Sequence, residues 1–574
     1  MGLDAVFPWR EGFECDNAPG RASGSPRVGQ SVALCVLCGW VFTSTPLGGA
    51  PPPAPIALRD VSDAAGVRFR FETGGRGRHD LPEIMGGGVA LIDGDGDGRL
   101  DLFFCNGGPI GGQGGDPPCR YFRNLGGGAF TDATQNALAP GPTYAMGAAV
   151  GDYDGDGRDD LFVTGWRDQR LYRNAGGGRF DDLTGKAGLG SDLWSTSAAW
   201  ADLDGDGDLD LCVAAYLDYD AARAPYCAAP DGRKDFCGPE DFPAQPDRLY
   251  RNNGDGTFTD VSRTAGIDLP EGRGLGVVVA DLTGDPRPDV FVANDGTPCW
   301  LFENLGGLRF REVGQAAGVA LDGRGEALAG MGAAVGDLDG DGRTDLVVTN
   351  FFGRSTVAFR AHAAGSFLDA SALTGLAATT RAVNGFGLAL VDLDGDGRLD
   401  LVQANGHVLD RARLGVPFAM RPTLLHNAGA RLDDVAAGAG PWFSRPILGR
   451  GLAVGDLDGD GRPDLVVAAL DAPAAVLRNE SPGRSVAVEL APGRTRHTPF
   501  GARLRVTVGG RSFVRDVPGG GSYLSASDRR VYLGLGDALR LDRIDVAWPA
   551  GETESWTDIP ATGPVKLVAG TGKK

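Results

Sequence analysis

The residues best suited to chemistry in this chain are aspartates that recur in one short spacing. Residues 456–464 read DLDGDGRPD, so acids stand at positions 1, 3, 5 and 9 and a turn glycine stands at position 6. Carboxylates this close repel one another unless a cation lies between them, and carboxylate oxygens are ligands that Ca²⁺ prefers. The spacing predicts a calcium loop in which positions 1, 3, 5 and 9 supply carboxylates and position 7 supplies a backbone carbonyl.

Six relatives of this loop lie upstream, at intervals of roughly 60 residues, which indicates a repeat architecture. The fourth copy is degenerate, because Thr283 replaces an acid and Pro286 replaces the turn glycine. We therefore expect six full Ca²⁺ sites and one degenerate site. The predicted ligand residues are Asp93, Asp95, Asp97, Arg99 and Asp101; Asp152, Asp154, Asp156, Arg158 and Asp160; Asp202, Asp204, Asp206, Asp208 and Asp210; Asp281, Asp285 and Asp289; Asp337, Asp339, Asp341, Arg343 and Asp345; Asp392, Asp394, Asp396, Arg398 and Asp400; and Asp456, Asp458, Asp460, Arg462 and Asp464.

An EF-hand and a polar turn without metal are the two alternatives to a calcium-loop repeat. An EF-hand needs a bidentate Glu at position 12 and helices on both flanks. Position 12 is Phe104 in the first loop and Val467 in the last, and the flanks are short apolar runs with β character. A polar turn without metal is the second alternative, but seven clusters of unneutralised acids would be costly.

The composition supports a large metal-binding β protein. Of 574 residues, 93 are Gly and 36 are Pro, and the formal net charge is −20. Seven divalent cations would neutralise most of that charge. An acidic chain lacks the basic surface that nucleic acid requires, so we expect no nucleic-acid partner.

The elements that position the loops are predicted to be short strands. Each loop is followed by an aromatic-Arg-Asn run, a glycine turn and a Phe-x-Asp-Val run, and these hairpin signals predict about four strands in each unit, as in propeller blades. The seventh unit stops at Glu480 without its final strand, while a matching segment lies at residues 57–67. We predict a seven-bladed β-propeller over residues 58–480, closed by that N-terminal strand. An open solenoid is the alternative.

These loops and their β context resemble the FG-GAP repeat family, the calcium-loop propeller repeats also found in integrin α chains. Residues 481–574 lack the Asp loops and predict a small β-sandwich-like domain. Their runs GARLRVTV, GGGSYLS, LGLG and AWP resemble the ASPIC/UnbV domain. The combination is similar to the cartilage acidic protein family of bacterial type. This resemblance implies a secreted calcium-binding protein and no established reaction.

The N-terminus and the cysteines predict an extracytoplasmic location. Residues 28–50 are typical of a secretory signal, and the polar leader 1–27 before them indicates a mis-assigned start. A membrane anchor is the alternative, but the apolar run is short for a span, so we expect none after signal removal. The protein is thus expected to be secreted, periplasmic or at the cell surface. Cys227 and Cys237 are the first disulfide candidate, and Cys105 with Cys119 is a second.

Two functions remain open from the sequence. The first is a non-catalytic binding or adhesion module for an extracellular protein or glycan, whose blades calcium would make rigid. The alternative is an extracytoplasmic polysaccharide-active enzyme of lyase or dehydratase type, which the resemblance allows because some FG-GAP-type propellers host such sites. Its candidate residues are His407, Arg411 and Arg413. A compact cluster of His, Arg and Tyr in a pocket at the propeller mouth would favour the enzyme.

Overall fold

The computed structural model describes residues 56–574, apart from 76, 111–118, 139–140, 230–231, 430, 471, 494–497 and 550. The predicted leader and signal, residues 1–27 and 28–50, lie outside the described residues. Within the described ranges, no helix has the length and apolar character needed to cross a membrane.

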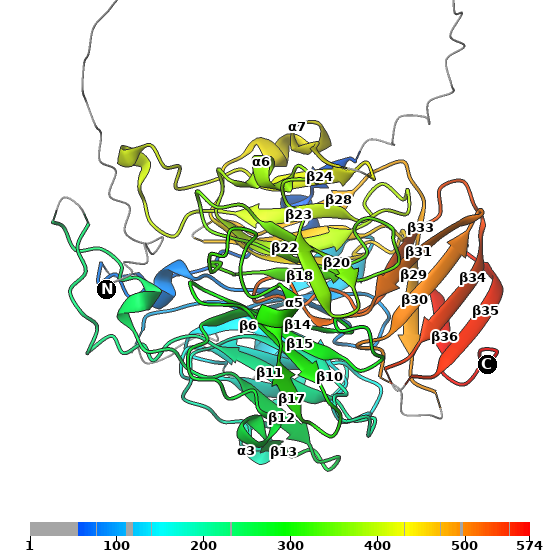
Figure 1. The fold of residues 1–574 in the computed structure, drawn as a ribbon, viewed down its shortest axis with the longest axis horizontal. Coiled ribbons are helices and arrows are strands. Elements are labelled where there is room, and N and C mark those ends of the chain that lie inside the picture. The colour runs from blue at the N-terminus through cyan, green and yellow to red at the C-terminus, as the bar shows by residue number, and fades with distance from the viewer. Residues whose placement is uncertain are drawn as a thin grey trace, which may run out of the picture. The chain divides into compact units, whose positions relative to one another are not determined.

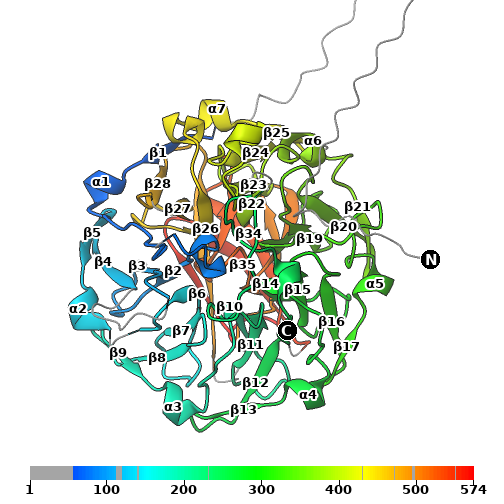
Figure 2. The same ribbon diagram turned by 90° about the vertical axis from the view of Figure 1, so that its left-hand side faces the viewer.

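Antiparallel meanders of four strands dominate residues 58–479, and Figure 2 shows them arranged around a common centre. In the first six sheets the spatial order of the strands follows the sequence. These sheets contain β2 (Val89–Ile92), β3 (Asp101–Phe104), β4 (Arg120–Gly126) and β5 (Ala129–Asp132); β6 (Ala145–Gly151), β7 (Asp160–Gly165), β8 (Arg170–Asn174) and β9 (Phe180–Asp182); β10 (Ser195–Ala201), β11 (Asp210–Ala215), β12 (Arg248–Asn252) and β13 (Phe258–Asp260); β14 (Gly274–Ala280), β15 (Asp289–Asn294), β16 (Trp300–Asn304) and β17 (Phe310–Glu312); β18 (Ala333–Gly336), β19 (Asp345–Val348), β20 (Val357–Ala363) and β21 (Ser366–Asp369); and β22 (Gly385–Val391), β23 (Asp400–Asn405), β24 (Thr423–Asn427) and β25 (Leu432–Asp434).

The seventh sheet takes its outer strand from the opposite end of the chain. It contains β26 (Gly449–Gly455), β27 (Asp464–Ala469) and β28 (Ala475–Asn479), and β1 (Leu58–Asp60) pairs antiparallel with β28. Leu58 faces Asn479 in the register and packs with Leu465 and Leu477 in one apolar cluster. β1 therefore completes the seventh sheet to four strands and joins the two ends of the propeller.

One-turn helices mark the outer rim of the propeller (Figure 2). They are α1 (Ser62–Ala65), α2 (Thr134–Ala137), α3 (Thr184–Ala187), α4 (Ser262–Ala265), α5 (Gly314–Ala317), α6 (Leu376–Thr380) and α7 (Ala436–Ala439). The Asp that ends a preceding strand caps several of them. At α1, Asp60 Oδ1 accepts both the backbone N–H (3.1 Å) and the hydroxyl (2.6 Å) of Ser62. Short 3₁₀ turns η1 (Leu81–Ile84), η2 (Pro239–Asp241), η3 (Ala412–Leu414) and η4 (Pro441–Ser444) lie in longer connections.

The C-terminal residues form two further sheets beside the propeller (Figure 1). One has β29 (Ser485–Ala491) between β33 (Val531–Gly534) and β36 (Val565–Val568), with β29 and β36 parallel. The other has the order β31 (Arg511–Asp516), β30 (Arg503–Val508), β34 (Arg540–Ala547) and β35 (Thr553–Pro560). Leu504, Ile544 and Trp548 belong to their shared apolar core. The predicted all-β fold, a β-propeller followed by a smaller β domain, is confirmed.

Residues 519–528, here called the hub segment, leave the C-terminal domain and run into the centre of the propeller. Its first two residues form β32 (Gly519–Gly520), which pairs with β14. Ser522 and Leu524 adopt left-handed backbone conformations (φ 60° and 56°), which side chains other than Gly rarely take. The hub segment makes hydrogen bonds to the first strand of each propeller sheet, or to the residue just before it, through Val89, Ala148, Ser197, Val277, Ala333, Leu388 and Leu452.

We predict that Gly88→Ala destabilises the fold by displacing the hub segment. A Cβ on Gly88 would lie 1.5 Å from the Leu524 carbonyl oxygen, so one of the two backbones must move. Overpacking of this kind costs about 1–3 kcal/mol or more. Gly185→Ala is the matched control, because nothing lies within 4 Å of its added Cβ. Urea unfolding of both variants measures the difference, and equal unfolding free energies would show that the hub segment does not occupy this position.

Candidate metal centres

Each Asp loop connects the first and second strands of its sheet, and its own carboxylates hold the turn. In the seventh loop, Asp456 Oδ1 accepts the N–H of Gly459 (2.8 Å) and of Asp460 (3.1 Å), while Oδ2 accepts the N–H of Gly461 (2.9 Å). Gly459 and Gly461 have φ of 81° and 87°, a region that favours glycine. The glycines therefore allow the turn, and the position-1 carboxylate fixes it.

The position-9 carboxylate joins the loop to the rest of the sheet. Asp464 Oδ2 accepts the N–H of Leu457 (2.9 Å), and Oδ1 accepts the N–H of Asn479 (2.7 Å) in the third strand. The same pair of bonds occurs at Asp210 and Asp400. These carboxyls are buried, and burial raises the pKa of Asp464 to about 8.

The structure brings the predicted ligand carboxylates together. Ligand atoms of positions 1, 3 and 5 lie within 4.8 Å of one another in the first, second and third loops, at Asp93, Asp95 and Asp97; Asp152, Asp154 and Asp156; and Asp202, Asp204 and Asp206. An all-oxygen set of this kind suits Ca²⁺, which takes 6–8 oxygen ligands in flexible geometry. The donor set therefore fits the predicted ion, which itself stays a prediction.

Arginines lie beside the acids, and those of the third strands were not predicted from the sequence. In the seventh sheet, Arg478 Nε of the third strand lies 2.8 Å from Asp458 Oδ2 at position 3. Position-7 Arg462 pairs with Asp460 and donates from Nε to the Asn479 carbonyl (2.9 Å). The corresponding third-strand pairs are Arg123–Asp95, Arg173–Asp154, Arg251–Asp204 and Arg360–Asp339. The recurring aromatic-Arg-Asn run was the available signal for these residues.

The Asn of that run links neighbouring blades. Asn479 Nδ2 donates to the carbonyl of Pro463 in its own loop (3.1 Å) and to that of Leu393 in the preceding loop (2.9 Å). The same bridge connects Asn124 to Leu457, Asn252 to Tyr153, Asn304 to Leu203 and Asn427 to Leu338. One Asn side chain thus holds two loops, so a disordered loop would also remove a hydrogen bond from its neighbour.

The fourth loop keeps its turn but lacks two charged residues, the position-3 acid and the third-strand arginine that faces it in other sheets. Asp289 still accepts the N–H groups of Leu282 and Thr283, and Asp281 accepts that of Gly284. Thr283 occupies position 3, and the third-strand residue is Glu303, which pairs with Arg311 instead. The acid and its cationic partner are thus both missing from this copy.

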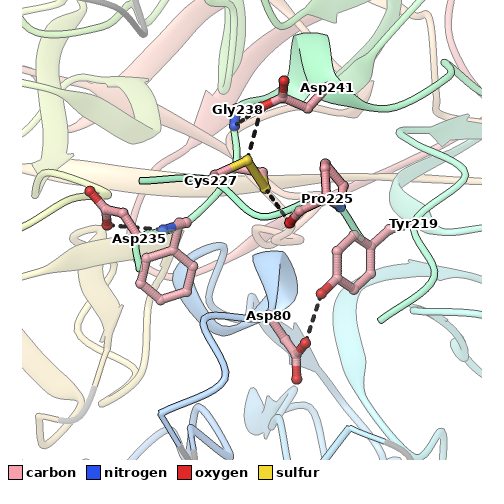
Figure 3. Close-up of a disulfide and its surroundings, with 9 residues drawn as sticks. Asp80, Tyr219, Pro225, Cys227, Asp235, Gly238 and Asp241 are labelled. Atoms are coloured by element: carbon pink, nitrogen blue, oxygen red, sulfur yellow. Dashed lines mark hydrogen bonds between the residues drawn. A yellow bond between two sulfur atoms is a disulfide. The ribbon is translucent and has the colours of Figure 1, made fainter. Parts of the chain in front are cut away.

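The insertions meet near the disulfide shown in Figure 3. The predicted disulfide between Cys227 and Cys237 is confirmed. Tyr219 donates its hydroxyl hydrogen to Asp80 Oδ1 (2.8 Å), and Arg411 forms a 2.5 Å ion pair with Asp235. Three segments that are distant in sequence, before β2, after β11 and after β23, therefore converge here.

The candidate catalytic residues have other contacts. His407 is buried, its Nδ1 accepts the N–H of Leu409 (3.0 Å), and its ring packs against Phe351 and Phe352. Burial lowers the pKa of His407 to about 4, so the ring is neutral at physiological pH. Arg411 is paired with Asp235, and Arg413 is exposed.

The second candidate disulfide is not formed. Cys105 and Cys119 are free thiols, and both are buried. The pKa of Cys105 is raised, first by burial and then by its contact with Cys119. The two thiols contact each other without a bond, so the expectation of a second disulfide is wrong for this structure.

We predict that, in excess chelator, the protein becomes less stable as the pH rises. The folded-state pKa of Asp464 lies above the value of about 3.9 for an exposed carboxyl, so the folded state holds this proton more tightly. Its contribution to the free energy of unfolding therefore falls as pH rises from about 4 to about 8. The melting temperature should rise when the pH is lowered from 8 to 6. Asp464→Asn should reduce that rise, whereas exposed Asp63→Asn should not, and identical slopes in all three proteins would contradict the prediction.

Comparison with protein families identifies repeats and a C-terminal domain. The FG-GAP-like repeat model matches residues 93–163, 152–213, 230–292, 281–348 and 337–402, which together span about half of the chain. The FG-GAP repeat model matches residues 448–484, and the ASPIC and UnbV model matches residues 493–574.

Known proteins with similar sequences are cartilage acidic proteins. Cartilage acidic protein 1 of Homo sapiens is 26% identical over 305 residues, which cover 52% of this chain and 44% of that protein. The Xenopus tropicalis protein is 30% identical over 178 residues, or 30% of this chain and 26% of its own length. The chain thus spans less than half the length of these relatives.

Solved structures give distant matches. An Agrocybe aegerita lectin that recognises non-reducing terminal N-acetylglucosamine is 19% identical, with a TM-score of 0.38, over 67% of this chain and 85% of the lectin. YCF48 bound to D1 peptide is 9% identical, with a TM-score of 0.39, over 75% of this chain and 99% of that one.

Proposed function

We propose, because this chain belongs to the FG-GAP-like repeat family, that it is a secreted calcium-binding β-propeller acting as a non-catalytic interaction module. The observation that carries the proposal is the clustering of carboxylates on the repeated Asp loops, the fourth of which lacks its position-3 acid. Calcium would be held by positions 1, 3, 5 and 9 with the position-7 carbonyl, in six full sites and one degenerate site. The fold alone does not determine a function, so the proposal rests on these sites.

Electrostatics supports a structural role for the ion. The carboxylates of one loop repel one another, and the arginines that lie beside positions 3 and 5 offset only part of that charge. A divalent cation bound to the folded state alone would stabilise it. Since Asn bridges couple adjacent loops, ordering one loop would favour the next.

The convergence of insertions supports a contact surface. Binding residues often lie on loops that a rigid scaffold positions, and here the 216–247 insertion is held by a disulfide and by bonds to Asp80 and Arg411. We propose an extracellular protein or glycan as the partner of this surface. The polysaccharide-active alternative receives no support from His407, whose ring is packed and whose Nδ1 is already bonded.

We predict that chelation lowers the melting temperature, and that the loops differ in importance. Ligand binding to the folded state contributes about 2.7 kcal/mol per site at a hundredfold excess over Kd. Asp458→Ala removes a carboxylate from a full loop, whereas Thr283→Ala alters a loop that already lacks an acid. Differential scanning calorimetry in Ca²⁺ should show a larger fall in melting temperature for Asp458→Ala than for Thr283→Ala. No effect of chelator on protein shown to be calcium-loaded would refute the calcium proposal.

The interaction half of the proposal has its own test. The purified protein should retain at least one glycan or secreted protein in an array screened with Ca²⁺, and binding should weaken in chelator because the loops that order the blades lose their ion. A double Cys227→Ser, Cys237→Ser variant should weaken binding through the insertion while calcium stabilisation persists. Binding unaffected by both changes would exclude this surface.

A further inference from the structure

We infer that the sixth loop, residues 392–400, binds a transition-metal cation such as Zn²⁺ through Asp394, Asp396 and His426. The inference replaces Ca²⁺ by another cation at this one of the six full loops, and it leaves the calcium proposal for the other five unchanged. Its basis is one position in the third strand of each sheet, which faces position 3 of the loop. That position holds Arg123, Arg173, Arg251, Glu303, Arg360, His426 and Arg478 in chain order. A guanidinium cannot coordinate a metal, whereas a neutral imidazole is among the commonest metal ligands.

The distances between the three side chains match a single metal centre. His426 Nε2 lies 3.1 Å from Asp394 Oδ2 and 3.8 Å from Asp396 Oδ2. One ligand atom from each of the three residues lies within 4.8 Å of the others. Two ligands bonded to the same Zn²⁺ at about 2.0–2.1 Å stand roughly 2.8–3.0 Å apart in octahedral geometry and roughly 3.3–3.4 Å apart in tetrahedral geometry. Small adjustments of Asp396 would complete the set.

Two of the three ligands are buried, and Asp396 is half-buried and hydrogen-bonded to Arg398. The exposed fraction is 5% for His426 and 2% for Asp394. His426 Nε2 and Asp394 Oδ2 lie 3.1 Å apart, and they form an ion pair when the imidazole is protonated. Neither atom makes a directed hydrogen bond, and buried polar groups in this state are costly unless something else satisfies them. A cation that replaced the imidazole proton would coordinate both atoms.

The sixth loop also differs in its surrounding charge. Arg515 of the C-terminal domain is buried, and its guanidinium lies 3.6 Å from Asp392 Oδ2 and donates to the Gly397 carbonyl (3.1 Å). Arg398 pairs with Asp396, as its equivalents do in other loops. Ca²⁺ relies on many anionic oxygens, and the fixed charge of Arg515 at position 1 weakens such a site. Zn²⁺ needs only three or four protein ligands and accepts imidazole nitrogen.

A small cavity adjoins this loop. It has a volume of about 150 Å³ and lies between the fifth loop, the sixth loop and β31, with Asp339, Asp396, Arg398 and Phe513 among its lining residues. Asp396 belongs both to the cavity and to the ligand set, so at least one proposed ligand borders open space.

Calorimetric titration of the full chain with Zn²⁺, in saturating Ca²⁺, tests the inference. The expected result is one tight Zn²⁺ site in the native protein. His426→Arg should weaken it on the order of tenfold or more, since even outer-shell partners of a metal site are worth 10–100-fold in affinity. This variant installs the residue that most other sheets carry, so the fold should be retained. Arg360→Gln changes the same strand position in the fifth sheet and should leave the Zn²⁺ affinity unchanged.

The outcomes separate this inference from the calcium proposal. His426→Gln serves as a second variant if His426→Arg fails to fold. Zn²⁺ binding that is the same in native protein and in the folded His426 variant would overturn the inference, because His79, His362 or the protein surface would then hold the ion. The melting shift produced by Ca²⁺ should persist in the His426 variant. Absence of a Ca²⁺-dependent melting shift in the native protein would count against the calcium proposal and not against this inference.

Discussion

The need to neutralise carboxylates confined to small turns governs much of this structure. At each full loop, position 1 is satisfied by backbone N–H groups of the turn, and position 9 by N–H groups of the loop and the third strand. Positions 3 and 5 lie against arginines, except in the sixth loop, where His426 faces position 3. Because each of these bonds reaches a different element, the acids tie the first, second and third strands of a sheet together, and the Asn bridges extend the connection to the neighbouring sheet.

Residues of the C-terminal domain also contact the acidic loops. Arg515 lies beside Asp392 of the sixth loop, Arg529 pairs with Asp159 next to the second loop, and the Asp456 N–H donates to the Tyr532 hydroxyl. These contacts, together with the hub segment, place the C-terminal domain on the face of the propeller that carries the acidic loops. A change in the ionic state of a loop would therefore be felt by residues of both domains, a coupling that a freely jointed pair of domains would lack.

Much of the fold was predictable from repetition, because a loop that recurs with its flanking β runs specifies both the strands and their order. The segment 57–67 was predicted as a closing strand from its match to other units, and the structure pairs Leu58 with Asn479. The partner of a side chain was harder to predict. Asn124 donates to Leu457, 333 residues away, and only the closed ring brings them together. The Gly-rich run at 519–521 carries no strand signal of its own, and β32 depends on the edge that β14 provides.

β1 closes the propeller at its outer edge and the hub segment fills its centre, and both come together late in synthesis. β1 can pair only after β28 has been synthesised, more than 400 residues later, and the hub segment can enter only after all seven first strands exist. A nascent chain on the ribosome would expose both an unclosed edge and an unfilled centre until its last hundred residues emerge. Truncated translation products should consequently behave as substrates for chaperones and proteases rather than as smaller functional propellers.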